Sequence, residues 1–373
     1  MKRVLFAAIV LILIAPQGAF SQAGQAGLSF LKNGVGARSV AMGNAGVALG
    51  DLGSAMYYNP ALLADDERAS ISIVHNEWIQ DISTEYIGIS LPANGWSFGV
   101  FLGLTSVAGI ELRDTPSPEP DGTFDSQNFA GGITASFGLA DVLDFGFNLK
   151  YIFEKIHVDD ASGYAVDLGV SSQPFTDGDL RDLRFGAALS NLGSMSALSS
   201  VETTLPLLLR YGAGYAIPVR ALKSAVNIEV GGVSLLEEST THANIGVEFD
   251  YVDMVFLRLG YRSGFDDKDI SFGAGARYSS LRFDYAFVPH NDSFGNAHTN
   301  IAEAGDLLSS RANATLDNRA SMAHRAAFGG LASGNECHDR LRHVFHDELG
   351  RLLLVRAADF TDKHDLFGVG VIF

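Results

Sequence analysis

Residues that could carry out chemistry are few in this chain, and their spacing matches no catalytic motif. The sequence contains no Gly-x-Ser-x-Gly nucleophile elbow, no phosphate-binding loop and no His-Glu-x-x-His zinc helix. His75, Asp81 and Ser83 are near neighbours in the sequence, and residues of these types can form a hydrolase site at the edge of a loop. Because no motif surrounds them, an ordinary polar loop is the simpler interpretation. We therefore expect that this protein is not an enzyme.

Metal-binding residue types gather in two places, and neither has the spacing of a known site. Cys337, His338, His343 and His346 could share an ion on one helix, but they fit a solvated helix face equally well. The run from Asp266 to Asp269 could hold calcium weakly, or it could be a hydrated acidic turn. We expect no metal and no cofactor.

The composition is that of an apolar chain with little charge. Of 373 residues, 47% are hydrophobic and 18% are charged, and there are 41 Gly and 25 Phe. The formal net charge of -17 argues against nucleic acid as a partner, because phosphate binding requires a basic surface. The single Cys excludes a disulfide framework within one chain.

The first residues are typical of a cleaved signal peptide. Lys2 and Arg3 precede an apolar stretch, Val4 to Ala15, which is too short to span a bilayer as a helix. Small residues at Ala19 and Ser21 suit a signal peptidase, so we assign residues 1–21 to the leader. The alternative is an N-terminal anchor helix. Either way, the chain is expected to be exported.

From Ala69 onward, apolar residues alternate with small or polar ones, which predicts strands with two different faces. The clearest case is residues 143–154, longer than the usual soluble strand of about five or six residues. A soluble sandwich also alternates, but its outer face carries many charges. Here the second face is rich in Gly, Ala, Ser and Asn, as in a crowded lumen. We therefore predict an all-β fold, a transmembrane antiparallel β-barrel.

Counting the alternating segments gives about fourteen strands, with short connections at one end and longer ones at the other. Short turns are expected around Asn94, Asp141 and Ser279, and long loops over residues 106–126 and 192–204. This asymmetry is typical of outer-membrane barrels, whose short turns are periplasmic. The barrel strands up to the thirteenth are expected within residues 69–288.

The end of the chain departs from this pattern. Residues 289–365 contain the only Cys and a stretch with helical spacing, and we expect them to form an atypical extracellular insertion. It could be an ordered, partly helical domain, a disordered segment, or foreign to the natural reading frame. Residues 366–373 alternate again and are expected to be the closing strand. Phe373, an aromatic last residue, is expected to be the signal for the barrel-assembly machinery.

Before the strands comes a glycine-rich stretch with almost no charge. It covers residues 36–50 and continues through Tyr57, Tyr58, Asn59, Pro60 and Ala61 to Leu63. We expect residues 22–68 to form a hatch inside the barrel, because small residues allow close backbone packing. Pro60 should hold Asn59 out of helical geometry, although the same residues could merely start a helix.

This stretch, with the strand series behind it, resembles the opening of PorV/PorQ-type outer-membrane proteins of the FadL-like long-chain fatty-acid transporter superfamily. The resemblance implies a fourteen-stranded barrel with a luminal hatch, and it maps the hatch motif onto Asn59, Pro60 and Ala61. In that family the last strand would follow soon after His298, so the insertion expected here is a departure.

The resemblance also implies a function. We expect passive transport or binding of hydrophobic small molecules in the outer membrane. The alternative is a surface-protein shuttle or anchor associated with type nine protein secretion. The expected partners are outer-membrane lipid, the barrel-assembly machinery, and either a hydrophobic ligand or a secreted cargo protein.

Overall fold

The computed structural model describes residues 27–65, 68–78, 82–140, 142–199, 202–264, 270–289 and, for the backbone, 296–305. The predicted leader at residues 1–21 lies outside this range, and so do residues 306–373, which include Phe373. The leader and the role of Phe373 as an assembly signal therefore remain predictions.

In the described part of the chain, fourteen strands make up the wall. They are β1 (Ser70–Glu77), β2 (Ile82–Ala93), β3 (Trp96–Leu112), β4 (Gly122–Ala140), β5 (Leu143–Ile156), β6 (Asp159–Ser172), β7 (Leu183–Met195), β8 (Leu208–Val219), β9 (Ser224–Leu235), β10 (Thr240–Tyr251), β11 (Val255–Ser263), β12 (Ile270–Tyr278), β13 (Leu281–Pro289) and β14 (Asn296–Gly305). The helical elements are short: η1 (Ser29–Leu31), α2 (Ala37–Ala41), α3 (Leu52–Tyr58), η2 (Pro60–Asp65), η3 (Gly178–Leu180) and η4 (Arg220–Leu222). No described helix is long and apolar enough to cross a membrane.

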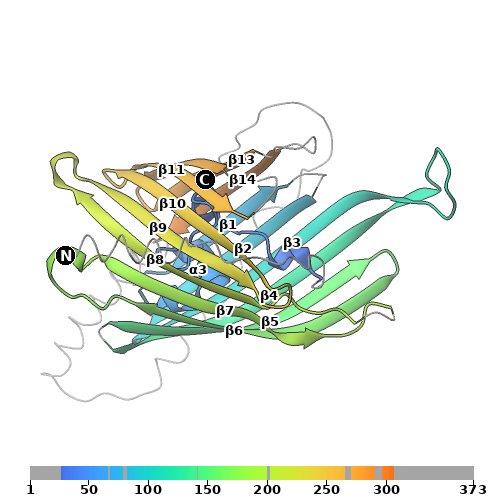
Figure 1. Ribbon diagram of the computed structural model, residues 1–373, viewed down its shortest axis with the longest axis horizontal. Coiled ribbons are helices and arrows are strands. Elements are labelled where there is room, and N and C mark those ends of the chain that lie inside the picture. Colours follow the sequence, from blue (N-terminus) through green and yellow to red (C-terminus); the bar gives the residue numbers. More distant parts are fainter. Residues whose placement is uncertain are drawn as a thin grey trace, which may run out of the picture. The chain divides into compact units, whose positions relative to one another are not determined.

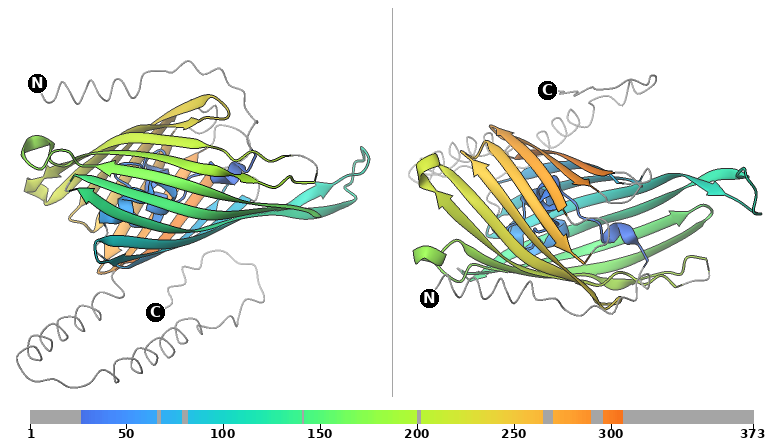
Figure 2. Two further views of the ribbon diagram at one scale, coloured as in Figure 1. Left: turned by 90° about the horizontal axis from the view of Figure 1, so that it is seen from below. Right: turned by 45° about the horizontal axis from the view of Figure 1, so that its top comes forward.

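The strands form one closed antiparallel barrel. Each strand pairs with its neighbours in sequence, and β1 also pairs with β14, where Ser70 lies opposite Gly305 and Glu77 opposite His298. Figures 1 and 2 show the tilted strands surrounding a lumen. Closure leaves no long sheet edge unpaired. The predicted all-β barrel of about fourteen strands is confirmed.

The position of the last strand corrects the sequence-based expectation. Residues 296–305 form β14, between β13 and β1, within the range expected to be an extracellular insertion. The place expected for residues 366–373 is therefore already occupied. The alternation in β14 was too weak to detect, because Ile301 is its only large apolar residue.

The two ends of the barrel differ, as expected. At one end, here the turn end, β2–β3, β10–β11 and β12–β13 are joined by short turns. The other end, the loop end, carries most of the longer connections. One expected loop is wrong in part: β3 continues to Leu112 and β4 begins at Gly122, so most of residues 106–126 form a hairpin that projects beyond the other strands (Figure 1).

The wall has an apolar outside and a polar inside. On β11, Leu257 and Leu259 are 55% and 51% exposed, whereas Arg258 between them is 5% exposed and lies in the lumen. Exposed apolar side chains of this kind recur around the wall: Ile73, Ile89, Leu91, Phe98, Val100, Leu102, Ile133, Phe147, Leu149, Leu168, Phe272, Phe283 and Tyr285. A water-soluble protein has the opposite distribution of charge. The outer surface is therefore suited to hydrocarbon rather than to water.

The N-terminal segment fills the lumen. We call residues 27–65 the hatch; they include η1, α2, α3 and η2, which lie inside the ring of strands in Figure 2. The helix α2 contacts β11 to β14, α3 contacts β1 and β2, and η2 contacts β3 to β6. Most hatch residues from Ala37 to Leu63 are buried.

Candidate functional site

The Asn59-Pro60-Ala61 motif forms a bend inside the barrel. Asn59 ends α3 with an extended backbone (φ −159°, ψ 102°), as expected for a residue that precedes proline. Its side-chain Nδ2 donates to Val47 O at 2.8 Å and to Val170 O on β6 at 3.0 Å. Its Oδ1 accepts the Ala61 N–H at 3.1 Å. Asn59 thus connects two parts of the hatch to the wall; a functional role for the motif remains a prediction.

Glycines in the wall allow the hatch backbone to come unusually close. A Cβ atom on Gly146 of β5 would overlap the backbone of Pro60, and one on Gly169 of β6 would overlap Asn59 Oδ1. Further wall glycines would overlap the hatch in the same way: Gly186 with Val47, Gly214 with Leu49, Gly246 with Met42, Gly260 with Gly43 and Gly273 with Ala41. The glycine-rich inner face therefore provides space for the hatch.

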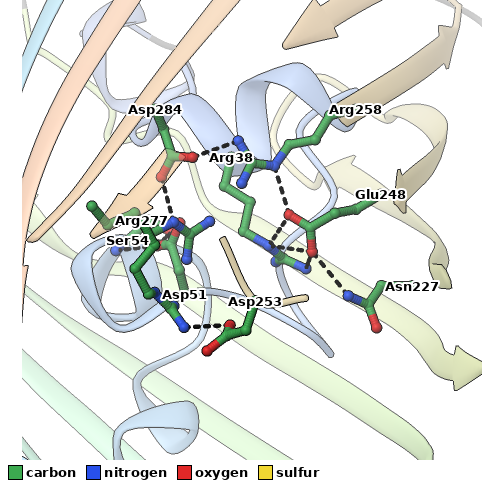
Figure 3. Close-up of polar contacts among 10 residues, drawn as sticks. Arg38, Asp51, Ser54, Asn227, Glu248, Asp253, Arg258, Arg277 and Asp284 are labelled. Atoms are coloured by element: carbon green, nitrogen blue, oxygen red, sulfur yellow. Dashed lines mark hydrogen bonds and ion pairs between the residues drawn. The ribbon is translucent and has the colours of Figure 1, made fainter. Parts of the chain in front are cut away.

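An ionic network fixes α2 to the wall at β10, β11 and β13 (Figure 3). Arg38 of α2 donates through Nε and Nη2 to the Glu248 carboxylate, the latter at 2.9 Å. Arg258 Nε donates to Glu248 Oε2 at 2.6 Å, and Arg258 Nη1 donates to Asp284 Oδ1 at 2.6 Å. The side chains of Arg38 and Glu248 are 7% and 4% exposed. Removing one partner from a network buried to this degree should strongly destabilise the protein, because the remaining charge would be buried without a partner.

Other polar side chains of the wall bind the hatch backbone directly. Glu229 accepts the N–H groups of Ala48 and Leu49 at 2.9 and 3.0 Å. Four more wall residues contact hatch carbonyls: Ser136 with Ala61, Asn148 with Met56, Asn244 with Asn44 and Ser271 with Ala41. These bonds satisfy backbone groups that would otherwise be buried without a partner.

Between the hatch and the loop end lies a mostly apolar cavity with a volume of about 50 Å³. Its hatch side is formed by Phe30, Leu31 and Met56, and its wall side includes the stacked rings of Tyr86 and Phe101, 6.0 Å apart between centroids. The position near the loop end follows from Thr84, which also lines the cavity and is the third residue of β2. An apolar, aromatic cavity with few polar groups is the usual form of a small-molecule site.

Three charged residues line this cavity, Lys150, Asp167 and Arg210, and each contacts a neighbouring side chain. Lys150 Nζ lies 2.7 Å from Asp167 Oδ1, with both side chains less than 10% exposed. The guanidinium of Arg210 lies over the Tyr57 ring, 4.8 Å from its centroid, and donates to Ser190 Oγ at 3.1 Å. The lysine is therefore paired and the arginine is stacked, so neither offers an unpaired charge to a ligand in the cavity.

The alternative sites considered from the sequence are not assembled in the described residues. His75 lies on the outer face of β1 and pairs with Glu85 across to β2, not with Ser83. Asp81 lies outside the described residues. No group of metal-binding side chains is present among the residues that the structure describes. Cys337, His338, His343, His346 and the run from Asp266 to Asp269 lie outside them.

The sequence-based site omitted the residues that hold the hatch and line the cavity. Arg38, Glu229 and Glu248 come from distant parts of the chain, and so do Lys150 and Arg210. A signal was available for those on strands, because each is a charged residue at an inward position of an alternating segment. The other side chains on the inner face of the wall are mostly small, so a charged side chain among them requires a partner in the lumen.

Comparison of the sequence with protein families finds no match, and comparison with curated proteins finds none. Among solved structures, the Pseudomonas putida toluene transporter TodX aligns with a TM-score of 0.51 and 13% identity, covering 74% of this chain and 98% of that chain. The CymD monoaromatic hydrocarbon channel aligns with a TM-score of 0.50 and 12% identity, covering 73% and 96%. At this identity the similarity establishes a common fold, and this chain therefore shares the barrel fold of these two channels.

Proposed function

We propose that this protein is an outer-membrane channel for the passive transport of small hydrophobic molecules, and that monoaromatic hydrocarbons are the first class to test. The observation that carries the proposal is the apolar cavity lined by Tyr86, Phe101 and Leu31 inside a hatch-filled barrel. The fold shared with a toluene transporter and a monoaromatic hydrocarbon channel supports the same class of ligand.

The exterior supports a location in a membrane. Its exposed Leu, Ile, Val and Phe side chains would be costly in water, whereas a set of charged side chains that includes Glu229, Glu248 and Arg258 is buried in the lumen. Bilayer lipid is therefore the proposed surrounding of the wall. The short turns at one end and the longer loops at the other suggest that the loop end faces outward from the cell.

The proposed path begins at the loop end, where an apolar molecule enters the cavity and rests against Tyr86 and Phe101. An engineered cavity of about 150 Å³ is known to bind benzene, whereas this cavity measures about 50 Å³. In this proposal the structure corresponds to a closed state, in which a ligand must displace side chains such as Phe30 or Met56. Onward passage would require movement in the hatch, whose bend at Asn59 is held by hydrogen bonds rather than by covalent links.

Filling the cavity tests this proposal. A Cβ atom on Gly103 would make only ordinary contacts, at 3.6 Å from Ala130 O and 3.8 Å from Tyr86 Cδ2, so Gly103→Leu should fold and occupy the cavity. The matched control is Gly122→Leu on β4, where nothing lies within 4 Å. Cells producing the native protein or Gly122→Leu should take up radiolabelled toluene faster than cells without the protein. Cells producing Gly103→Leu should take it up no faster than cells without the protein. Equal uptake by all four strains would refute the proposed function.

The resemblance to PorV/PorQ-type proteins keeps a shuttle or anchor role in type nine secretion as an untested alternative. That role would depend on the surface of the loops rather than on the lumen. No cavity or contact described above favours it, whereas the apolar cavity favours transport. Co-purification of a secreted cargo protein from detergent extracts would be the observation that revives it.

A further inference from the structure

The wall separates between β7 and β8 near the loop end. These strands pair from Leu183 opposite Tyr215 to Ser190 opposite Leu208. β7 nevertheless continues to Met195, and its last residues pair with β6. Within the described chain, this part of β7 therefore faces the irregular segment 202–207 instead of a neighbouring strand.

Asn191 lies where the two strands part. Its backbone is left-handed (φ 69°), and the β6–β7 register shifts there, so that Ser190 and Asn191 lie opposite Asp167. The Asn191 N–H donates to Asp167 Oδ1 at 2.7 Å, and Lys150 Nζ donates to Asn191 Oδ1 at 2.5 Å. Asn191 Nδ2 donates to Pro206 O at 2.8 Å. One buried side chain thus joins the Lys150–Asp167 pair to segment 202–207.

Segment 202–207 folds inward over the hatch. Leu205 is 4% exposed and belongs to an apolar cluster with Leu28 and Leu31 of the hatch and Ile152 of β5. The Gly27 N–H donates to Thr204 O at 3.2 Å. Because Leu31 also lines the inner cavity, the apolar cluster that contains Leu205 adjoins the wall of that cavity.

On the other side of this segment is a second hollow, here the outer cleft, with a volume of about 490 Å³. It is lined by residues 191–195 of β7 and by Glu202, Thr203, Thr204, Leu205 and Leu207. The cleft is large enough for a monoaromatic molecule, by comparison with the cavity of about 150 Å³ that binds benzene. Asn191 and Leu205 thus lie between the outer cleft and the inner cavity.

We infer that residues 202–207 are a gate between the outer cleft and the inner cavity, latched by Asn191. Opening requires loss of the Asn191–Pro206 hydrogen bond and withdrawal of Leu205 from Leu28 and Leu31. Passage of a ligand through this gate rests on the proposed transport function. Movement of the gate itself does not.

Gate movement can be measured without a transported ligand. Asn191→Gly removes the latch but keeps the left-handed backbone available. In a Cys337→Ser background, the substitution Leu31→Cys, at a position that is 5% exposed, reports access to the cavity. Labelling of this cysteine by an external maleimide should be about fivefold faster with Asn191→Gly, the factor for losing one ordinary hydrogen bond. The control, Asn94→Gly, makes the same change at another left-handed asparagine (φ 52°) in the β2–β3 turn, and labelling should not change.

A reversible lock tests the effect on passage. A Cβ atom on Gly27 would lie 3.0 Å from Thr203 Cγ2, so Gly27→Cys with Thr203→Cys can form a disulfide between hatch and gate. Oxidation should stop toluene uptake and reduction should restore it. The control pair, Ser83→Cys with Ser106→Cys, joins facing wall residues of β2 and β3 and should leave uptake unchanged.

The two measurements separate the two proposals. Unchanged labelling in Asn191→Gly would overturn the gate, and so would full uptake by the oxidised lock in cells where the native protein transports toluene. Faster labelling together with no uptake by the native protein would support the gate and refute the proposed ligand class.

Discussion

Glu248→Gln should loosen the hatch, because it removes the carboxylate that two buried arginines share. Glu248 accepts from Arg38 Nη2 at 2.9 Å and from Arg258 Nε at 2.6 Å, and also from Asn227 Nδ2 at 2.9 Å. Glutamine has the same shape but only one acceptor oxygen, so its NH₂ group must face an N–H donor. Removing one partner of a buried ion pair costs about 3–5 kcal/mol.

The control is the exposed pair of His75 and Glu85, whose atoms lie 2.6 Å apart but whose side chains are 48% and 55% exposed. Glu85→Gln should cost less than about 1 kcal/mol, because water screens exposed pairs. Arg38→Met combined with Glu248→Gln should recover part of the loss, since Arg258 still has Asp284 at 2.6 Å. Comparing the two Glu→Gln variants therefore separates the effect of burying an ion pair from the effect of forming one.

Stability would be measured by urea unfolding in lipid vesicles, followed by the change in gel mobility of the folded barrel. Ion conductance in a planar bilayer would report the hatch directly: the native lumen is filled, so Glu248→Gln should conduct more than Glu85→Gln. If Glu248→Gln unfolds at the same urea concentration as Glu85→Gln and conducts no better, the ionic network does not hold the hatch.

Three further predictions test other parts of the structure. Gly169→Val should destabilise the barrel by about 1–3 kcal/mol through overlap with the hatch, whereas Gly122→Val should not; equal urea midpoints would contradict the close packing. Leu257→Arg on the outer face should cost about 2–4 kcal/mol in a bilayer, and a neutral effect on unfolding in vesicles would argue against a lipid-facing wall. Phe101→Ala should raise uptake of naphthalene relative to toluene by enlarging the cavity, and Phe98→Ala on the outer face should leave that ratio unchanged; the same ratio in both variants would remove Phe101 from the path.

The wall could be predicted from the sequence because the bilayer requires an apolar outer face at every second residue. β5 shows this well: alternation over residues 143–154 predicted a strand that runs from Leu143 to Ile156. β14 was missed because small residues and a single Ile at 301 leave no detectable pattern. A strand with small side chains, such as β14, forms because it pairs with its neighbours, here β13 and β1. Its own sequence periodicity does not reveal it.

The site was harder to predict for a different reason. The bend at Asn59 is local, and the proline that follows was enough to expect it. The pairing of Arg38 with Glu248 joins residues 210 positions apart, and no spacing in the sequence reveals it. The cavity is a property of hatch and wall together: Leu31, Tyr86 and Lys150 come from different elements, and only closure of the barrel around the hatch brings them together.

The most direct test of the account is the location of a bound ligand. Crystals of the detergent-purified protein soaked with bromobenzene would show the bromine by its anomalous scattering. If apolar molecules pass through the inner cavity, a peak should lie between Leu31, Tyr86 and Phe101, and it should be absent in Gly103→Leu and present in Gly122→Leu. A native protein that transports toluene but binds bromobenzene only outside the lumen would contradict the central claim.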